Sequence, residues 1–163
     1  MDARRRFLLA GAGLLCAARA VAQATGEVQL PPVEDLRQAL GKVRRQRVPL
    51  LVLFSTPGCP YCREVRRSYL MPRLAEQSAT SAPTLLIHEI DITSRAPLID
   101  EQGRKTTQAD FAARFGIRMV PVVALFDENA QLLADPLVGI DRSGFYEAYL
   151  ARAIEQAGKR LRS

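Results

Sequence analysis

The chain has 163 residues and a formal net charge of +6, from 23 basic and 17 acidic residues. This length is that of one domain, large enough to build a hydrophobic core without disulfide or metal staples. Because no basic run is interleaved with aromatic residues, the positive charge is not of the kind that binds nucleic acid.

The first 22 residues are typical of an export signal. Three arginines at residues 4–6 precede a short apolar stretch at residues 7–18, and Ala-Val-Ala at residues 20–22 is a small-x-small cleavage site. The apolar stretch is shorter than the roughly 20 residues of a membrane span. We therefore expect a periplasmic protein whose signal peptide, residues 1–22, is removed.

The arginines also indicate the export route. Arg-Arg-Arg-Phe-Leu at residues 4–8 resembles the twin-arginine signal, which carries folded proteins to the bacterial periplasm, and we favour this route over the ordinary Sec route. Cys16 would suit a lipoprotein anchor, but Leu15 before it is larger than the small residue usual there, so no anchor is expected. Removal of the signal leaves 19 basic and 16 acidic residues.

A polar leader at residues 23–32 precedes the first predicted helix, which ends near Arg44-Arg45. Four apolar residues recur in it at helical spacing: Val33, Leu36, Leu40 and Val43. The continuous apolar run at residues 48–54 then predicts a buried strand.

A second helix is expected after a short Pro/Gly turn. It starts at Cys59 or Pro60 and runs to about Gln77, with a kink or a break at Pro72, because proline lacks the backbone donor that a helix interior needs. After a loop, the β-rich residues 84–92 predict a second strand.

Residues 93–106 contain a proline, a glycine and mixed charge, and we interpret them as an inserted loop. Thr107 with Asp110 is typical of a helix N-cap, and Gly116 is expected to end this short helix. Residues 122–126 then predict a third strand.

The last part of the chain predicts a hairpin and a helix. After a turn at residues 127–129, residues 131–134 are expected to pair back on the third strand. Asp141 or Ser143 is expected to cap the final helix. Its inward face would hold Tyr146, Tyr149, Leu150, Ala153 and Ile154.

This order of elements predicts one α/β domain over residues 33–158, followed by a basic tail at residues 159–163. The strand–helix–strand opening favours a parallel pair, and the final hairpin an antiparallel pair. We therefore expect a mixed central sheet of about four strands, flanked by helices on both faces.

The most informative motif is Cys-Pro-Tyr-Cys at residues 59–62. A buried strand and a tight turn deliver Cys59 to the start of a helix, where free backbone N–H groups and the helix dipole favour a thiolate. Cys62 lies on the same helix face with its Cβ about 5–6 Å away, close enough for a disulfide. Since so short a loop adds little stability, the pair predicts a dithiol/disulfide switch.

A metal site is the alternative for any C-x-x-C pair. Structural zinc takes four ligands, whereas the chain after residue 22 offers two cysteines and the single histidine His88. His88 falls on a predicted strand, where a structural role is favoured. We therefore expect no metal and no prosthetic group.

The sequence resembles the thioredoxin fold in three features taken together: the order of the strands and helices, Cys59 and Cys62 at the end of the first strand, and Val120-Pro121 before the third strand. Within that superfamily the chain is similar to periplasmic thioredoxin-like proteins, including those associated with sulfur oxidation (the SoxW type). The resemblance implies that Pro121 is cis and that the Val120 backbone faces a substrate beside Cys59. Spacing alone leaves cis and trans equally open, since proline is allowed at the first position of a strand.

The chain departs from ordinary thioredoxins at several positions. Leu53 stands where they have a buried aspartate, and the chain has no tryptophan. Glutaredoxins share Cys-Pro-Tyr-Cys, but the glycine pair and acids with which they hold glutathione correspond here to Val-Gly-Ile-Asp at residues 138–141. Glutathione specificity is therefore not expected.

These features predict a thiol:disulfide oxidoreductase in which Cys59 attacks a substrate disulfide and Cys62 resolves the mixed disulfide. Tyr61 either contacts the substrate or is a packed surface aromatic. The arginines that follow, Arg63, Arg66 and Arg67, either lower the pKa of Cys59 or form a solvated basic face, and we favour the second.

We favour a reducing role, because the sequence pattern shows neither a second cysteine pair nor a helical domain inserted into the thioredoxin-like fold. The expected partners are protein thiols or disulfides and a membrane electron donor of the DsbD or CcdA kind, and the expected state is a monomer. A disulfide-donating oxidase and a redox-inert peptide-binding or chaperone module are the alternatives. Cytochrome c maturation, sulfur oxidation and repair remain open as pathways.

Overall fold

The computed structural model describes residues 29–79 and 83–163, so the predicted export signal lies outside the described residues. The helices and strands are α1 (Leu36–Gln46), β1 (Leu50–Ser55), α2 (Pro60–Glu64), the π-helical η1 (Val65–Leu70), α3 (Met71–Ser78), β2 (Leu86–Asp91), β3 (Pro97–Ile99), β4 (Lys105–Thr107), α4 (Gln108–Arg114), β5 (Val122–Phe126), β6 (Leu137–Val138) and α5 (Tyr146–Arg162). Within the described ranges, no helix combines the length and the apolar character needed to cross a membrane.

The centre of the domain is a mixed four-stranded sheet with the order β2-β1-β5-β6. β1 is parallel to β2, with Ser55 opposite Asp91, and antiparallel to β5, with Phe54 opposite Val122. β5 and β6 are antiparallel. The predicted α/β class and the predicted mixed sheet of about four strands are confirmed.

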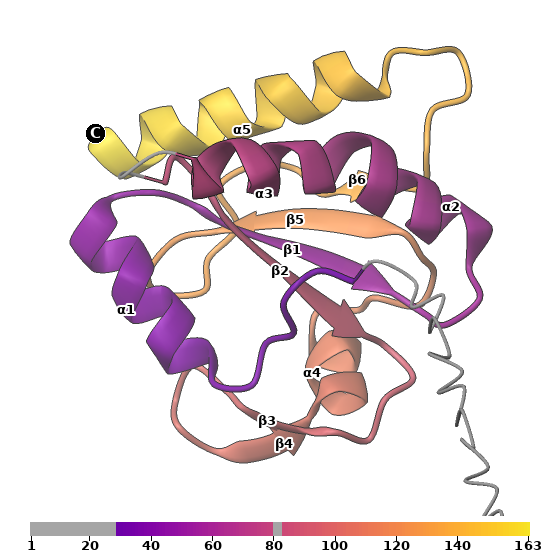
Figure 1. Ribbon diagram of the computed structural model, residues 1–163. Coiled ribbons are helices and arrows are strands. Elements are labelled where there is room, and N and C mark those ends of the chain that lie inside the picture. The colour runs from indigo at the N-terminus through magenta and orange to yellow at the C-terminus, as the bar shows by residue number, and fades with distance from the viewer. Residues whose placement is uncertain (1–28, 80–82) are drawn as a thin grey trace, which may run out of the picture.

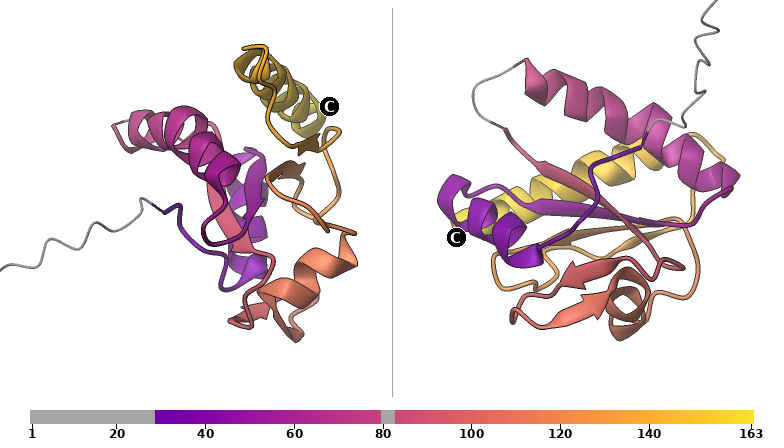
Figure 2. Two further views of the ribbon diagram at one scale, coloured as in Figure 1. Left: turned by 90° about the vertical axis from the view of Figure 1, so that its right-hand side faces the viewer. Right: turned by 60° about the horizontal axis from the view of Figure 1, so that its bottom comes forward.

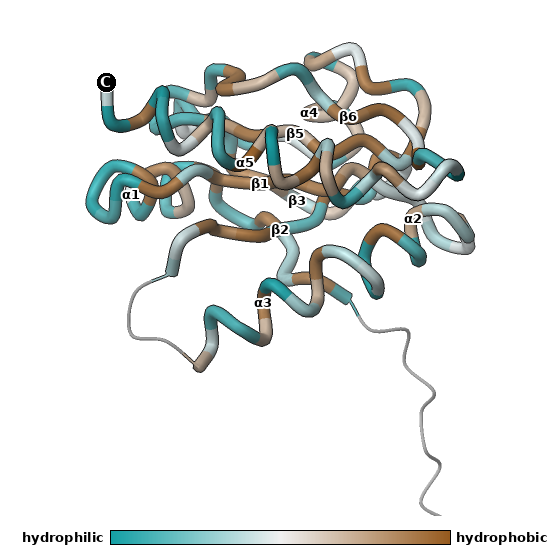
Figure 3. Tube along the Cα trace, turned by 90° about the horizontal axis from the view of Figure 1, so that it is seen from above, coloured by the Kyte–Doolittle hydropathy of each residue, from teal (hydrophilic) through white to brown (hydrophobic). Residues whose placement is uncertain are grey.

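Helices cover both faces of this sheet, α1 and α4 on one side and α3 and α5 on the other (Figures 1 and 2). Successive residues of β1 point to opposite faces, so Val52 and Phe54 pack in the layer of α1 and α4, while Leu51 and Leu53 pack in the layer of η1 and α5. All six residues of β1 are buried. Apolar residues accordingly follow β1 and β2 in the view from above (Figure 3).

The first helix is shorter than predicted. Val33, Leu36, Leu40 and Val43 are buried as their spacing requires, but the helix starts only at Leu36, because the Asp35 side chain caps it by accepting from the Arg37 N–H. The chain before it is extended, and Pro32 forms a bridge with Glu89 on β2.

The long helix of residues 60–78 is continuous through Pro72. Proline occupies the first turn of α3, where its missing N–H costs little, and the preceding η1 takes up the change in winding. Of the predicted kink or break at Pro72, the break does not occur; a π-helical segment that starts three residues after Cys62 leads into α3 instead.

The stretch predicted as an inserted loop contains β3 and β4, which pair as a small hairpin. Figure 2 shows this hairpin beside α4, apart from the main sheet. Asp100 ties it together, because its buried carboxylate accepts from the Arg104 N–H and side chain and from Arg114 of α4. Burial alone would raise the pKa of Asp100, but these hydrogen bonds outweigh it and hold the pKa below its usual value.

The prediction of a strand at residues 131–134 is wrong in position. Leu132 makes only an isolated bridge to Phe126. The strand that returns to pair with the free edge of β5 is β6, at Leu137–Val138. Pairing is interrupted at Pro136, which has no N–H to donate to a sheet.

The final helix also differs from its prediction. Asp141 does not cap α5 itself; its carboxylate accepts from the Ser143 and Phe145 N–H groups in the turn before the helix. The buried face is Tyr146, Leu150, Ala153 and Ala157, while Tyr149 is 50% exposed. α5 continues to Arg162, through most of the residues predicted as a basic tail.

Candidate functional site

The cysteine motif lies at the end of the sheet where β1 stops. The turn after Ser55 contains Gly58, whose φ of 75° is a backbone conformation that side chains disfavour. Cys59 follows as the N-cap residue of α2, and Pro60 occupies the first helical turn, where proline is favoured. The strand, the turn and the helix therefore place Cys59 as the sequence predicts.

Cys59 and Cys62 are joined in a disulfide, with their Cα atoms 5.3 Å apart. The Cys59 sulfur also accepts from the Cys62 N–H at 3.1 Å, one of the free donors at a helix start. Cys59 is half-buried, whereas Cys62 is completely buried. Cys59 is therefore the more accessible of the two sulfurs; the attacking role of Cys59 and the resolving role of Cys62 stay predictions.

Pro121 lies at the same end of the sheet as the cysteines. The Val120-Pro121 peptide bond is cis, as the thioredoxin resemblance implies. Because Val122 is paired with Phe54, the register places Pro121 across from Ser55, the strand end that leads to Cys59. Pro121 is buried and Val120 is half-buried, so Val120 is the residue of this pair that remains accessible.

Exposed apolar side chains gather on the elements that meet at this end. Tyr61 is 44% exposed on α2, and its hydroxyl accepts from Arg142 in the loop before α5, with an N–O distance of 3.5 Å. Met119, beside the cis peptide, is 65% exposed, and Val138, paired with Val122, is 60% exposed. Phe145, at the start of α5, is 59% exposed, and we call Tyr61, Met119, Val138 and Phe145 the apolar rim.

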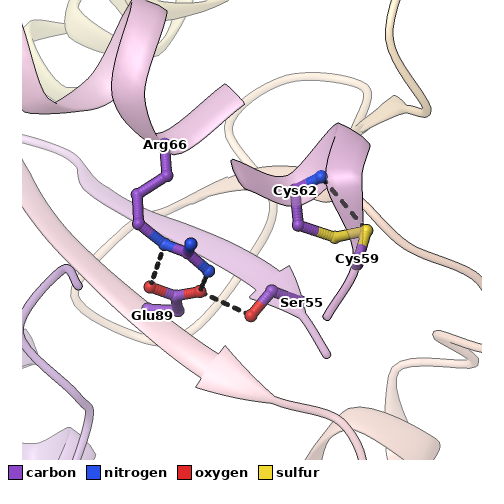
Figure 4. Close-up of a disulfide and its surroundings, with 5 residues drawn as sticks. All are labelled: Ser55, Cys59, Cys62, Arg66 and Glu89. Atoms are coloured by element: carbon purple, nitrogen blue, oxygen red, sulfur yellow. Dashed lines mark hydrogen bonds and ion pairs between the residues drawn. A yellow bond between two sulfur atoms is a disulfide. The ribbon is translucent and has the colours of Figure 1, made fainter. Parts of the chain in front are cut away.

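A buried ion pair lies behind the cysteines (Figure 4). Arg66, on η1, donates to Glu89 of β2 through Nε at 3.0 Å and Nη2 at 2.6 Å, and Ser55 donates its hydroxyl to the same carboxylate at 2.5 Å. Arg66 is 5% exposed and Glu89 is 9% exposed.

The interpretation of the three arginines as one solvated face is therefore wrong for Arg66. It holds for Arg63 and Arg67, which are exposed. Sequence analysis missed Glu89 and Ser55 altogether. The signal that would have found Glu89 is a lone acid inside an apolar β-rich run, which needs a buried partner.

His88, the single histidine, is surrounded by groups that hold the fold together. His88 sits on β2 with Nδ1 3.2 Å from the Pro32 carbonyl oxygen, and burial lowers the pKa of His88. In the described part of the chain, no three His, Cys, Asp or Glu side chains are grouped as metal ligands would be.

Fold and site together define the class: a cysteine pair at a helix start, at the end of the central strand and across from a cis proline, is the arrangement of a thiol:disulfide oxidoreductase. The model of the family described as a thioredoxin-like domain matches residues 36–154. The chain therefore belongs to the thioredoxin-like domain family.

Solved thioredoxin structures are similar to this chain. The X-ray structure of Fasciola hepatica thioredoxin is similar with a TM-score of 0.52 at 13% identity, over 78% of this chain and 99% of that one. Thioredoxin O2 from Arabidopsis thaliana in the oxidized state gives 0.47 at 20% identity, over 74% and 84% of the two chains. No curated protein matches the chain significantly. At 13% identity, the likeness to the Fasciola hepatica thioredoxin shows the fold alone.

Exchanging an apolar rim residue for a charged one should weaken substrate docking without changing the cysteines. We expect Met119→Glu to raise the KM for a protein disulfide about fivefold, corresponding to roughly 1 kcal/mol of lost contact. Reduction of a small-molecule disulfide, which needs no docking face, should keep its rate.

Leu132→Glu is the matched control, because Leu132 is 43% exposed at the opposite end of β5. Its KM should equal that of the unaltered protein. Equal KM values for both variants would show that the rim takes no part in docking.

Proposed function

We propose that this protein is a periplasmic reductant of protein disulfides. The observation that carries the proposal is the asymmetry of the Cys59–Cys62 pair, with one sulfur accessible at a helix start and the other fully buried. An accessible thiolate reaches a substrate sulfur, and a buried partner resolves the product while remaining protected from other thiols.

The exchange proceeds in two balanced steps. The Cys59 thiolate attacks one sulfur of a substrate disulfide, which forms a mixed disulfide and releases the other substrate sulfur as a thiolate. Cys62, after losing its proton, then attacks Cys59, which forms the Cys59–Cys62 disulfide and releases the second substrate thiolate. Two electrons pass to the substrate, and its two thiolates take up protons.

The reducing direction is inferred from the weak stabilisation of the Cys59 thiolate. Within the described residues, the hydrogen bond that reaches this sulfur comes from the Cys62 N–H. The exposed Arg63 and Arg67 act through water, which screens them. A modestly stabilised thiolate makes the dithiol form a better electron donor than in strong oxidants.

A reductant in an oxidising compartment must itself be reduced again. We infer that a membrane electron donor of the DsbD or CcdA kind supplies the two electrons that return Cys59 and Cys62 to the dithiol. The apolar rim beside Cys59 is the surface on which such a donor and the substrates would dock in turn.

The cysteine roles are tested by two single-atom replacements. Cys59→Ser should abolish insulin reduction, because the attacking sulfur is gone. Cys62→Ser should leave the mixed disulfide unresolved, so that non-reducing electrophoresis of periplasmic extract shows adducts that disappear with dithiothreitol.

Insulin reduction by Cys59→Ser would contradict this mechanism. The recovery of no adducts with Cys62→Ser would favour the redox-inert peptide-binding module.

The direction of electron flow is tested by titrating the cysteine pair against glutathione and dithiothreitol, with alkylation of free thiols as readout. We expect a potential near that of thioredoxin, about −270 mV. A value near −120 mV, that of a strong periplasmic oxidant, would instead identify a disulfide donor.

The location is tested with the full-length chain in a bacterium that has both export routes. We expect the periplasmic fraction to contain a chain that begins at Gln23. Arg4→Lys combined with Arg5→Lys should keep the precursor in the cytoplasm, whereas Arg6→Lys, the matched control, should be exported.

Export of the double variant would indicate the Sec route. Cytoplasmic retention of the unaltered chain would overturn the periplasmic assignment.

A further inference from the structure

The strongest unexplained feature near the cysteines is the buried pair of Arg66 and Glu89. Both side chains are almost fully removed from solvent. Arg66 donates to both oxygens of the Glu89 carboxylate, and the Ser55 hydroxyl donates to one of them. The Leu30 N–H also donates to Glu89, at 3.3 Å. Removing two charges from water is unfavourable before their mutual attraction is counted, so a need to fill the core does not by itself explain this pair.

The pair is attached to the cysteine motif from two sides. Arg66 lies four residues after Cys62 on the same continuous helix. Ser55 is the last residue of β1, four residues before Cys59. Figure 4 shows the ion pair and the disulfide in one region between the helix and the strand ends.

The remaining charges around the cysteines are of a different kind. Those on the neighbouring elements are exposed or half-buried: Arg63, Glu64, Arg67, Asp91, Arg118, Asp141 and Arg142. Water and salt screen such charges, whereas charges inside the protein interact over longer distances. Among the described residues near the motif, the buried side chains of opposite charge are Arg66 and Glu89, and their contact offsets the field of one with that of the other.

We propose that Glu89 sets the redox potential of the Cys59–Cys62 pair by neutralising Arg66. If Glu89 were neutral, the positive charge of the buried guanidinium would lose the compensation that this carboxylate gives, and it would stabilise the Cys59 thiolate more strongly. A stabilised thiolate favours the dithiol form, which makes the protein a stronger oxidant. Glu89 is thus a positioning residue that keeps the pair reducing, an inference that rests on the proposed redox function.

The proposal predicts opposite effects for the two partners. Glu89→Gln should lower the pKa of the Cys59 thiol, followed by thiolate absorbance. It should also shift the equilibrium with glutathione at least tenfold toward the dithiol, which corresponds to about 30 mV for two electrons. Arg66→Met removes the cation, leaves Glu89 and should shift both quantities the other way.

Two matched variants separate charge from packing. Arg66→Lys keeps the positive charge and should stay within about threefold of the unaltered protein, by the same thiol–disulfide equilibrium. Arg66→Met with Glu89→Gln removes both charges and should return to the same range. Because a merely structural role predicts damage of one sign from every change, shifts of opposite sign are specific to the electrostatic role.

The outcomes are separable. Shifts of the same sign in Glu89→Gln and Arg66→Met, or no shift in either, would overturn the inference. If Glu89→Gln does not fold by circular dichroism, the comparison of Arg66→Met with Arg66→Lys decides it alone, since only the former changes charge. Failure of the unaltered protein to titrate reversibly would instead overturn the proposed function.

Discussion

Complete burial of β1 is the constraint on which the site depends. All six of its residues are buried, and five of them pack alternately into the two helical layers. The strand can therefore neither slide nor rotate without exposing apolar side chains. Its pairing with β2 and β5 fixes where it ends. Cys59 and the cis peptide before β5 therefore meet at one edge, held by packing that is remote from the sulfur atoms.

Near the site, the described part of the apolar core contains a buried ion pair between Arg66 and Glu89. Thioredoxins have a buried acid on the first strand where this chain has Leu53, yet the Arg66–Glu89 pair places buried charge nearby from η1 and β2. Arg66 is carried by the π-helical segment, which begins within one turn of Cys62. Since π-helical segments often occur at functional sites, the altered winding and the buried cation belong to one local arrangement.

Different parts of the fold were predictable to different degrees. The third strand at residues 122–126 was predicted correctly, because a short apolar run bounded by Pro121 and an acidic turn has few alternatives. β6 was misplaced, because pairing beyond Pro136 depends on where the chain returns in space. The β3–β4 hairpin was missed, because its strands are three residues long and are held by Asp100 through Arg104 and Arg114 rather than by apolar periodicity.

The sequence by itself determined the cysteine pair, the strand before it and the proline before β5, because local spacing and turn residues act within a few positions along the chain. It also indicated which cysteine is accessible, through the N-cap position. Only the tertiary structure decided that Arg66 is buried while Arg63 and Arg67 are exposed, and that Glu89 is its partner. The two residues are 23 positions apart, and no local pattern reports which charges the packing of η1 against β2 will remove from water.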